Sequence, residues 1–226
     1  MINEKKKWTQ SILSSQMAFP AEYVIRIFKG SYPRLNLKKD PFTGKKICDV
    51  GCGDGRNLVL LKQCGFDVYG TEITKQIAQK AQDNLRRVGI SSDIKVSTNE
   101  AIDFKDETFD YVLSWNACYY MGGSKDFNDH VKELARILKK NGRLVLSIPK
   151  KTCFIYHDSE QFRKGYQIIR NDPFKIRNGV ILRMFKDEKE IKKVFSAYFK
   201  DFTFGSIHDD CFGYDYHWHL VSCQKK

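Results

Sequence analysis

The stretch ICDVGCGDGRN, residues 47–57, places three glycines within five positions directly behind a short apolar run. The run KICDV, residues 46–50, is typical of a buried strand, and RNLVLLKQC at 56–64 is typical of a helix that Gly65 ends. Glycine adopts backbone angles that other residues avoid and lets a ligand approach the main chain closely. The stretch therefore predicts a strand, a ligand-binding glycine loop and a helix.

The spacing of these glycines argues against two common nucleotide sites. A dinucleotide loop reads GxGxxG and needs its third glycine at position 56, where Arg56 stands, which disfavours a nicotinamide-dependent oxidoreductase. The phosphate loop GxxxxGK[ST] is also missing from the sequence. The loop instead reads as an acid, Asp49, followed by GxGxG at Gly51, Gly53 and Gly55.

Apolar patterns behind the loop alternate between strand and helix. The predicted strands are 66–73, 93–98, 109–115 and 143–149, and the predicted helices between them are 74–89 and 125–142. This alternation predicts an α/β fold with a doubly wound, mostly parallel sheet that carries helices on both faces.

The two ends of the chain differ from this pattern. One helix is predicted in the first 45 residues, at 20–30, and residues 151–186 read as irregular and rich in aromatic residues and arginine. A helix at 187–199 and two strands, at 201–207 and 216–224, close the chain. We expect these strands to form an antiparallel hairpin at one edge of the sheet, joined by a turn made of the residues between them.

Four segments together resemble the class I S-adenosylmethionine-dependent methyltransferases. They are DVGCGDG at 49–55, the acid Glu72 at the end of the second strand, the run from Ser97 to Met121, and ELARILKKNGRLVLSIP at 133–149. The resemblance covers about residues 45–150. It implies a Rossmann-like, seven-stranded sheet whose last strand is antiparallel, with S-adenosylmethionine as cofactor and S-adenosylhomocysteine as product.

The resemblance also implies roles for individual residues. The acid near the end of the first strand would face the ammonium group of the cofactor, and Glu72 would accept hydrogen bonds from both ribose hydroxyls. Relatives commonly carry Asp where Thr98 or Asn99 stands here, so the adenine amine would be contacted by the Asn99 amide oxygen, by Glu100 or by the backbone alone. The predicted cofactor-binding residues are Asp49, Gly51, Cys52, Gly53, Gly55, Glu72, Ile73, Asn99, Glu100 and Asn116.

The stretch HDDCFGYDYHWH, residues 208–219, gathers groups that a catalytic site could use, and the implied fold places it at the same rim as the cofactor. We expect His208 or His217 to take the proton of the methyl acceptor or to orient it. The same residues also fit an ordinary edge strand. A metal site of His208, Asp209 and Asp210 is a weaker alternative, because consecutive strand residues point to opposite sides, and no metal is expected.

Substrate specificity is expected outside the common core. We predict an N-terminal helical cap or substrate region at 1–45, a methyltransferase core at 46–226 and a lid-like insertion at 151–186. Arginines of the insertion would suit an anionic or phosphorylated acceptor, or could be ordinary surface residues on the outside of a lid; they are Arg163, Arg170, Arg177 and Arg183. Aromatic residues of the first region could wall the cofactor or acceptor, or could only anchor the N-terminal helix; they are Trp8, Phe19, Tyr23 and Tyr32.

Composition limits the partners. The net charge is +12, but the 39 basic residues are scattered, which favours a solvated surface over a nucleic-acid footprint. Seven cysteines without a CxxC pair suit a reducing compartment, and neither a secretory signal nor a membrane span of about 20 apolar residues is recognisable. We therefore expect a cytoplasmic protein that does not act at a membrane.

The sequence favours methyl transfer to a hydroxyl or amine of a small molecule, such as an anionic metabolite or sugar. DNA base methylation is disfavoured, because Ser114-Trp115-Asn116-Ala117 replaces the Asn/Asp-Pro-Pro-aromatic run of adenine enzymes and no proline precedes a cysteine. An RNA or protein acceptor stays open on charge grounds. A non-catalytic cofactor-binding protein is less favoured, because Asp49, the glycines and Glu72 are all present.

Overall fold

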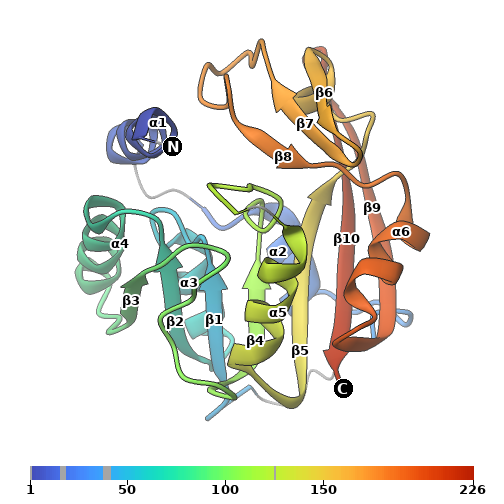
Figure 1. The fold of residues 1–226 in the computed structure, drawn as a ribbon. Helices are drawn as coiled ribbons and strands as arrows, with labels where there is room; N and C mark the ends of the chain where they lie inside the picture. Colours follow the sequence, from blue (N-terminus) through green and yellow to red (C-terminus); the bar gives the residue numbers. More distant parts are fainter. Residues whose placement is uncertain (1, 16–18, 38–41, 125) are drawn as a thin grey trace.

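The protein is described here by a computed structural model that covers residues 2–15, 19–37, 42–124 and 126–226. Its main sheet has seven strands in the order β3-β2-β1-β4-β5-β10-β9 (Figure 1). They are β3 (Asp93–Val96), β2 (Asp67–Glu72), β1 (Lys46–Val50), β4 (Phe109–Ser114), β5 (Leu138–Pro149), β10 (Tyr214–Lys225) and β9 (Phe199–Cys211). The first five pair in parallel, while β10 is antiparallel to both β5 and β9. The predicted Rossmann-like sheet with its edge hairpin is confirmed.

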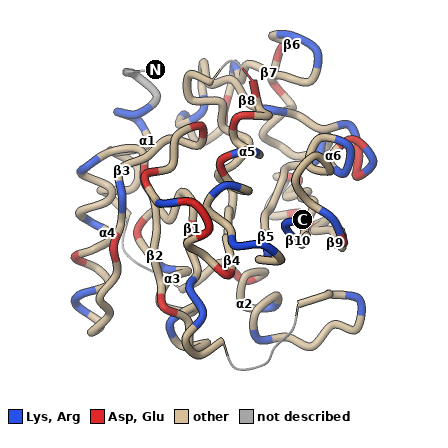
Figure 2. Tube along the Cα trace, turned by 60° about the horizontal axis from the view of Figure 1, so that its bottom comes forward, with Lys and Arg blue, Asp and Glu red and all other residues tan. Residues whose placement is uncertain are grey.

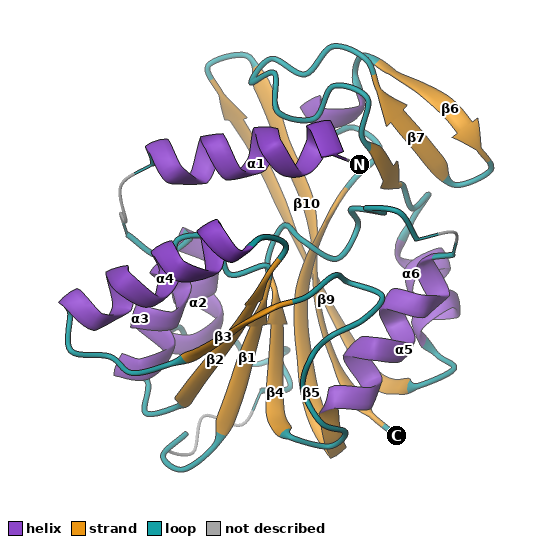
Figure 3. Cartoon of the chain, turned by 60° about the vertical axis from the view of Figure 1, so that its left-hand side comes forward, coloured by secondary structure: helices purple, strands orange, loops and turns teal. Residues whose placement is uncertain are grey.

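Helices cover both faces of this sheet. One face carries α2 (Glu22–Lys29), α3 (Arg56–Gln63) and α4 (Lys75–Arg87), and the other carries α5 (Phe127–Ile137) and α6 (Glu188–Phe195) (Figure 3). The α4 and α6 helices begin where the sequence predicts, because Thr74 and Asp187 each accept a hydrogen bond from a backbone N–H three residues further on.

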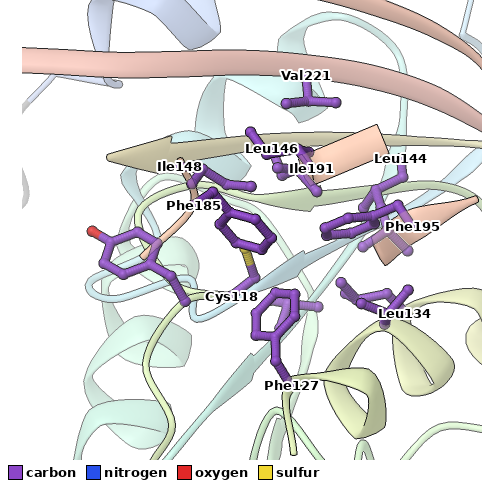
Figure 4. Packing of buried hydrophobic residues seen from close by; sticks show 14 of the residues in the cluster. Cys118, Phe127, Leu134, Leu144, Leu146, Ile148, Phe185, Ile191, Phe195 and Val221 are labelled. Carbon is purple, nitrogen blue, oxygen red and sulfur yellow. The ribbon is translucent and has the colours of Figure 1, made fainter. Parts of the chain in front are cut away.

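The alternation along β5 divides the core into two layers. Leu144, Leu146 and Ile148 pack with α5 and α6, whereas Val145 packs with the α2 and α3 side. Figure 4 shows the first of these layers, where Phe127 and Leu134 meet Phe185, Ile191 and Phe195 beneath β5. Both faces of the strand are therefore buried, which is why its sequence reads as one apolar run.

The N-terminal segment contains a helix that the sequence analysis missed, α1 (Ile2–Ser14). It lies above the carboxyl ends of the strands, beside α4 (Figure 3). Tertiary contacts hold it: the Lys80 ammonium of α4 donates to the carbonyls of Ile12 and Leu13, at 2.7 and 2.9 Å, and to that of Ser15. The carbonyls at the end of α1 are thus satisfied by a residue of another helix. For that reason the sequence of residues 2–14 carries only a weak local signal for a helix end.

The α5 helix ends earlier than predicted. The expected helix 125–142 stops at Ile137, and Leu138 already pairs with Phe109 in the sheet. The register then shifts before Tyr111 pairs with Arg143, and within this irregular segment Asn141 has a φ of 61°. The Asn141-Gly142 signal therefore marks a bulge in β5 instead of the end of the helix. Lys125 lies outside the described residues.

Residues 151–186 are less irregular than the sequence suggested. They contain the short helix η1 (Phe154–Tyr156) and a small antiparallel sheet of β6 (Ser159–Arg163), β7 (Tyr166–Ile169) and β8 (Ile181–Arg183). The small sheet lies beyond the carboxyl end of β5 (Figure 1). Its strands are three to five residues long, and β6 is mostly exposed while β7 alternates between half-buried and buried residues, so they lack the apolar runs that made the core strands recognisable.

The closing hairpin is confirmed, but its turn is much tighter than predicted. Cys211 pairs with Tyr214, so only Phe212 and Gly213 connect the strands. Their φ angles of 53° and 85° fit a two-residue primed turn. Residues 208–211 and 214–215, which were expected in the turn, extend the two strands instead.

None of the helices in the described ranges combines the length and the apolar character that a membrane crossing needs.

Candidate functional site

The glycine loop is fixed to the end of β2 by backbone hydrogen bonds. The N–H groups of Gly51 and Cys52 both donate to the Thr71 carbonyl at 3.1 Å, and the Gly53 N–H donates to Glu72 Oε1 at 2.6 Å. The Cys52 thiol is buried, and burial raises its pKa well above the usual value, so it stays neutral. The loop therefore presents backbone and a carboxylate at the point where strand order reverses between β1 and β4.

Two of the glycines are required by neighbouring protein atoms. Gly51 has a φ of 76°, and a Cβ there would lie 2.6 Å from Ala117 Cβ in the loop after β4. Gly55 has a φ of 89°, and its Cβ would lie 3.3 Å from Leu85 Cγ of α4. Both positions combine a left-handed backbone with close packing, which explains why glycine stands there. At Gly55 the packing against α4 is a sufficient reason, and no ligand needs to be invoked.

Glu72 is the carboxylate that closes this loop. It is 7% exposed, and besides the Gly53 N–H it accepts the Ile73 N–H at Oε2, at 2.9 Å. Burial raises the pKa of Glu72, while the two backbone N–H donors act against that rise. Each oxygen keeps a second lone pair, so the carboxylate can still accept hydrogen bonds from a diol.

Asp49 is fully buried behind the loop. Its Oδ2 accepts a hydrogen bond from Asn57 Nδ2 at 3.5 Å, while Oδ1 has no partner among the described residues. Burial is the main cause that raises the pKa of Asp49 to about 7. A buried carboxyl oxygen without a partner fits a site that a cation completes, and Asn57 stands between Asp49 and the cavity.

A cavity of about 370 Å³ opens in front of the loop. Of the predicted cofactor-binding residues, all but Asp49 and Gly55 are among its described lining; they are Gly51, Cys52, Gly53, Glu72, Ile73, Asn99, Glu100 and Asn116. The cavity is large enough for a nucleoside-sized ligand.

The amide of Asn99 has a definite orientation. Its Nδ2 donates to the carbonyls of Ala117 and Tyr120, both at 3.1 Å. Because both partners accept, the nitrogen must face them and Oδ1 is left to accept from a ligand amine. Glu100 follows it along the cavity wall, with Oε2 at 3.7 Å from the buried His130 Nε2.

Asn116 occupies a strained backbone position in the loop after β4. Its φ is 56°, its N–H donates to Ser147 Oγ at 2.8 Å, and Ser147 Oγ donates to Asn116 Oδ1 at 2.9 Å. The buried serine of β5 thus holds a non-glycine residue in the left-handed region beside the cavity. Such backbone is often found at binding sites.

The candidate catalytic histidines lie elsewhere on the same rim. His208 of β9 and His217 of β10 are directly paired, with ring centroids 4.7 Å apart. Lys150 Nζ lies 2.6 Å from His208 Nε2, and His217 Nδ1 lies 3.0 Å from Thr152 Oγ1. Desolvation first, and then the charge of Lys150, lower the pKa of His208. Neither histidine belongs to the described lining of the cavity.

The metal alternative at this hairpin has no support in the geometry. Within the described ranges, no three His, Cys, Asp or Glu side chains come close enough together to hold a metal ion. Asp209 instead accepts a hydrogen bond from the Tyr23 hydroxyl at 3.0 Å.

The lining also includes Trp8, which was named as a possible wall of the site, and three residues that the sequence analysis gave no role. Trp8 and Ile12 of α1 line the cavity, as do Asn57 and Tyr120. Tyr120 belongs to the ring-rich run behind β4, and Asn57 lies in the first turn of α3, so their place in the sequence could have indicated them. Phe19 and Tyr32, which were also predicted as possible walls of the site, are 86% and 48% exposed and are not in the described lining.

The donors and acceptors around the cavity fit S-adenosylmethionine. Glu72 accepts from hydroxyls as a ribose diol requires, Asn99 Oδ1 accepts from an amine, and the loop at Gly51 and Gly53 exposes backbone. Asp49 itself is fully buried and outside the described lining, whereas Asn57, which donates to it, lines the cavity.

Comparisons with known proteins agree with this site. Residues 48–146 match the family described as "Methyltransferase domain". A ubiquinone biosynthesis O-methyltransferase of Roseobacter denitrificans is 27% identical over 126 residues, covering 56% of this chain and 50% of the relative. A 2-methyl-6-phytyl-1,4-hydroquinone methyltransferase of Synechocystis is 34% identical over 105 residues, covering 46% of this chain and 32% of the relative. The chain thus spans about half or less of the length of these curated relatives.

Solved structures share the fold. A SAM-dependent methyltransferase from Methanosarcina mazei superposes with a TM-score of 0.65 at 22% identity, covering 86% of this chain and 98% of that one. A magnesium protoporphyrin IX methyltransferase from Synechocystis, with bound SAM, has a TM-score of 0.58 at 15% identity, covering 100% of this chain and 81% of that one. Residues 48–146 thus match a methyltransferase domain, and these structures share the fold; together they support a class I S-adenosylmethionine-dependent methyltransferase.

Proposed function

We propose that this protein transfers a methyl group from S-adenosylmethionine to a hydroxyl or amine of a small, anionic molecule such as a metabolite or sugar. The observation that carries the proposal is the Glu72 carboxylate, buried at the end of β2 and hydrogen-bonded to the glycine loop within the cavity. The curated relatives are named for small-molecule methylation, which supports a small-molecule acceptor.

When bound, the cofactor supplies a methyl carbon on a positively charged sulfur, which keeps the bond electrons and leaves as S-adenosylhomocysteine. The chain's own contribution is to position the reactants. Glu72 and Asn99 would hold the two ends of the nucleoside, and Asn57 the ammonium end. Trp8 and Ile12 line the cavity from α1, the helix above the carboxyl ends of the strands (Figure 3), and would limit water there. Alignment of this kind supplies much of the acceleration, because the leaving group is already good.

Cofactor binding is tested by Glu72→Ala. Affinity for S-adenosylmethionine and S-adenosylhomocysteine, measured by calorimetry, should fall by about 1–3 kcal/mol because a charge-assisted pair is lost. Glu22→Ala is the control, since Glu22 pairs only with Arg26 on the surface of α2 among the described residues. Absence of any uptake by the unaltered protein would refute the proposal, whereas equal affinity of both variants would refute only the ribose role of Glu72.

A catalytic role for His208 or His217 stays a prediction. It is supported by their place at the carboxyl-end rim, beside Lys150 and Thr152 at the end of β5. His217→Ala should lower the turnover number while cofactor affinity holds. Phe212→Ala at the exposed turn is the control. A rate like that of the unaltered protein would assign His217 to the structure of the hairpin.

The division into a cap at 1–45 and a lid at 151–186 remains part of the proposal. It is supported by the fact that α1 contributes Trp8, and the second segment Arg177, to the cavity lining. Residues 16–18 and 38–41 of the first region lie outside the described residues.

A further inference from the structure

Arginines of residues 151–186 were expected to face an anionic acceptor, and the structure separates them. Of these four arginines, Arg177 is in the described lining of the cavity, which also includes Arg56 at the start of α3. Arg183 is tied to Glu190 at 2.6 Å and to the Gly165 carbonyl at 2.7 Å, and Arg170 to Glu160 at 2.8 Å.

Arg177 is held rigidly from behind. Its Nη1 lies 2.9 Å from Asp172 Oδ1, and the Asp172 side chain is completely buried. The other oxygen of Asp172 accepts the backbone N–H groups of Ile176 and Arg177, at 2.9 and 3.0 Å. The carboxylate thus fixes both the turn and the guanidinium, so little side-chain entropy is lost when Arg177 binds a ligand.

The remaining donors of this group point to an acceptor. Arg177 Nε donates to the Tyr120 hydroxyl at 2.9 Å, so Nη2 keeps its two N–H groups without a described partner. The Tyr120 oxygen already accepts this bond and can offer its own proton to another group. An arginine fork beside a phenol suits a planar anionic oxygen group.

The walls around these donors are aromatic. The Trp8 ring meets Tyr120 edge to face, with centroids 5.5 Å apart, and the Arg177 guanidinium carbon lies 5.8 Å from the Trp8 centroid. Trp115 lines the same cavity. Flat apolar walls next to a fixed donor pair favour a ring that carries the anionic group directly.

Charge decides between a carboxylate and a phosphate. Asp172 balances Arg177, and Asp54 likewise pairs with Arg56, a second arginine of the lining, so Lys5 of α1 is the lining cation without a described carboxylate partner. Glu100 follows Asn99, whose amide donates to the Tyr120 carbonyl at 3.1 Å, so a carboxylate also lines the cavity on the Tyr120 side. Nearly balanced charge near Arg177 suits a singly charged group better than a dianion.

Building on the methyl transfer proposed above, we infer that Arg177 and Tyr120 bind the carboxylate of an aromatic acceptor and so determine its specificity. The ring lies between Trp8 and Trp115, and the carboxylate receives N–H groups from Arg177 Nη2 and the proton of the Tyr120 hydroxyl.

The experiment titrates benzoate, benzamide and phenylphosphonate into the protein saturated with S-adenosylhomocysteine, and follows binding by saturation-transfer NMR. Benzoate should bind about ten-fold or more tightly than its neutral isostere benzamide, and more tightly than the phosphonate dianion. Arg177→Gln should remove the preference for benzoate over benzamide. Tyr120→Phe, which keeps the ring, should reduce the preference several-fold, and it stands as the second variant if Arg177→Gln leaves Asp172 unpaired and the fold unstable.

Arg170→Gln is the matched control, because Arg170 lies in the same segment and pairs with Glu160 away from the cavity lining. It should keep the full preference. Equal binding of benzoate and benzamide, binding of neither, tighter binding of the phosphonate, or a preference that survives both cavity variants would overturn the inference. Calorimetry with S-adenosylhomocysteine distinguishes failure of this inference from failure of the proposed function. If the unaltered protein does not bind S-adenosylhomocysteine, the proposed function itself is refuted.

Discussion

At the scale of single residues, the site depends on where carboxylates are buried. Glu72 and Asp49 both lose water, but Glu72 gains two backbone N–H donors while one oxygen of Asp49 gains none among the described residues. Burial therefore raises the pKa of Asp49 to about 7, where it titrates near neutral pH. The two acids have similar chemistry and different environments: backbone N–H donors act against the rise in the pKa of Glu72, whereas Oδ1 of Asp49 has no such donor among the described residues.

Asp49 should make stability depend on pH in the protein without cofactor. The pKa of Asp49 is raised on folding, so the folded state binds the proton more tightly. Stability is therefore fully retained below the unfolded pKa and is lost as pH rises to about 7.

Urea unfolding at a series of pH values should test this against Asp49→Asn. Relative to the variant, the free energy of unfolding of the unaltered protein should fall by up to roughly 1.4 kcal/mol per pH unit between the two pKa values. A parallel course of the two curves across this window would show that Asp49 is not the titrating group. Added S-adenosylhomocysteine should flatten the difference if its ammonium group favours the charged form.

At the scale of elements, α1 is held in place by polar contacts with distant parts of the chain and by the packing of Trp8 on Tyr120. Lys80 of α4 binds carbonyls at its C-terminal end, Thr9 Oγ1 lies 3.1 Å from Thr74 Oγ1, and Lys7 Nζ donates to the Asn178 carbonyl at 3.3 Å. Trp8 and Ile12 reach the cavity from this helix. The cavity therefore loses one wall whenever α1 separates from α4.

Lys80→Met should loosen α1 without altering the sheet. Methionine keeps the apolar stem but leaves the α1 carbonyls without their donor. Hydrogen exchange of residues 2–15 should become faster, and affinity for S-adenosylhomocysteine should fall several-fold. Lys62→Met on α3, where Lys62 contacts only Asp67 at 3.5 Å among the described residues, is the control. Unchanged exchange in α1 would show that its other contacts suffice.

At the scale of the whole molecule, the charge of +12 is distributed over many elements. Figure 2 shows Lys and Arg on helices, strands and loops with Asp and Glu between them. Several of the bases are paired, as Arg136 is with Glu133 and Asp106, both at 2.7 Å. A dispersed and partly neutralised charge binds phosphate backbones weakly and loses them to salt.

An RNA acceptor remains an open alternative that this distribution disfavours. Bulk RNA should be retained on immobilised protein at low salt and released at about 0.15 M, because scattered lysines release few counterions. Filter binding across a salt series measures this retention. A cationic polymer of equal charge, measured under the same conditions, serves as the control for non-specific retention. Strong retention at that salt, together with methyl incorporation into RNA, would favour RNA over a small molecule.

The sequence by itself determined the order of the core elements and most of the predicted residues that line the cavity proposed to bind the cofactor. Strand and helix periodicity are local, and the glycine loop and Glu72 follow their strands directly, so each could be placed without tertiary information. The same local logic failed at Asn141-Gly142, because a bulge in a strand and the end of a helix use the same left-handed backbone.

Only the tertiary structure decided what surrounds the acceptor end of the cavity. It brings Trp8, Tyr120 and Arg177 together from α1, the loop after β4 and the segment before β8. It also extends the hairpin strands, so that His208 and His217 pair across β9 and β10 outside the described cavity lining. These contacts join residues far apart in the chain, and their energies depend on packing and desolvation that no local pattern encodes.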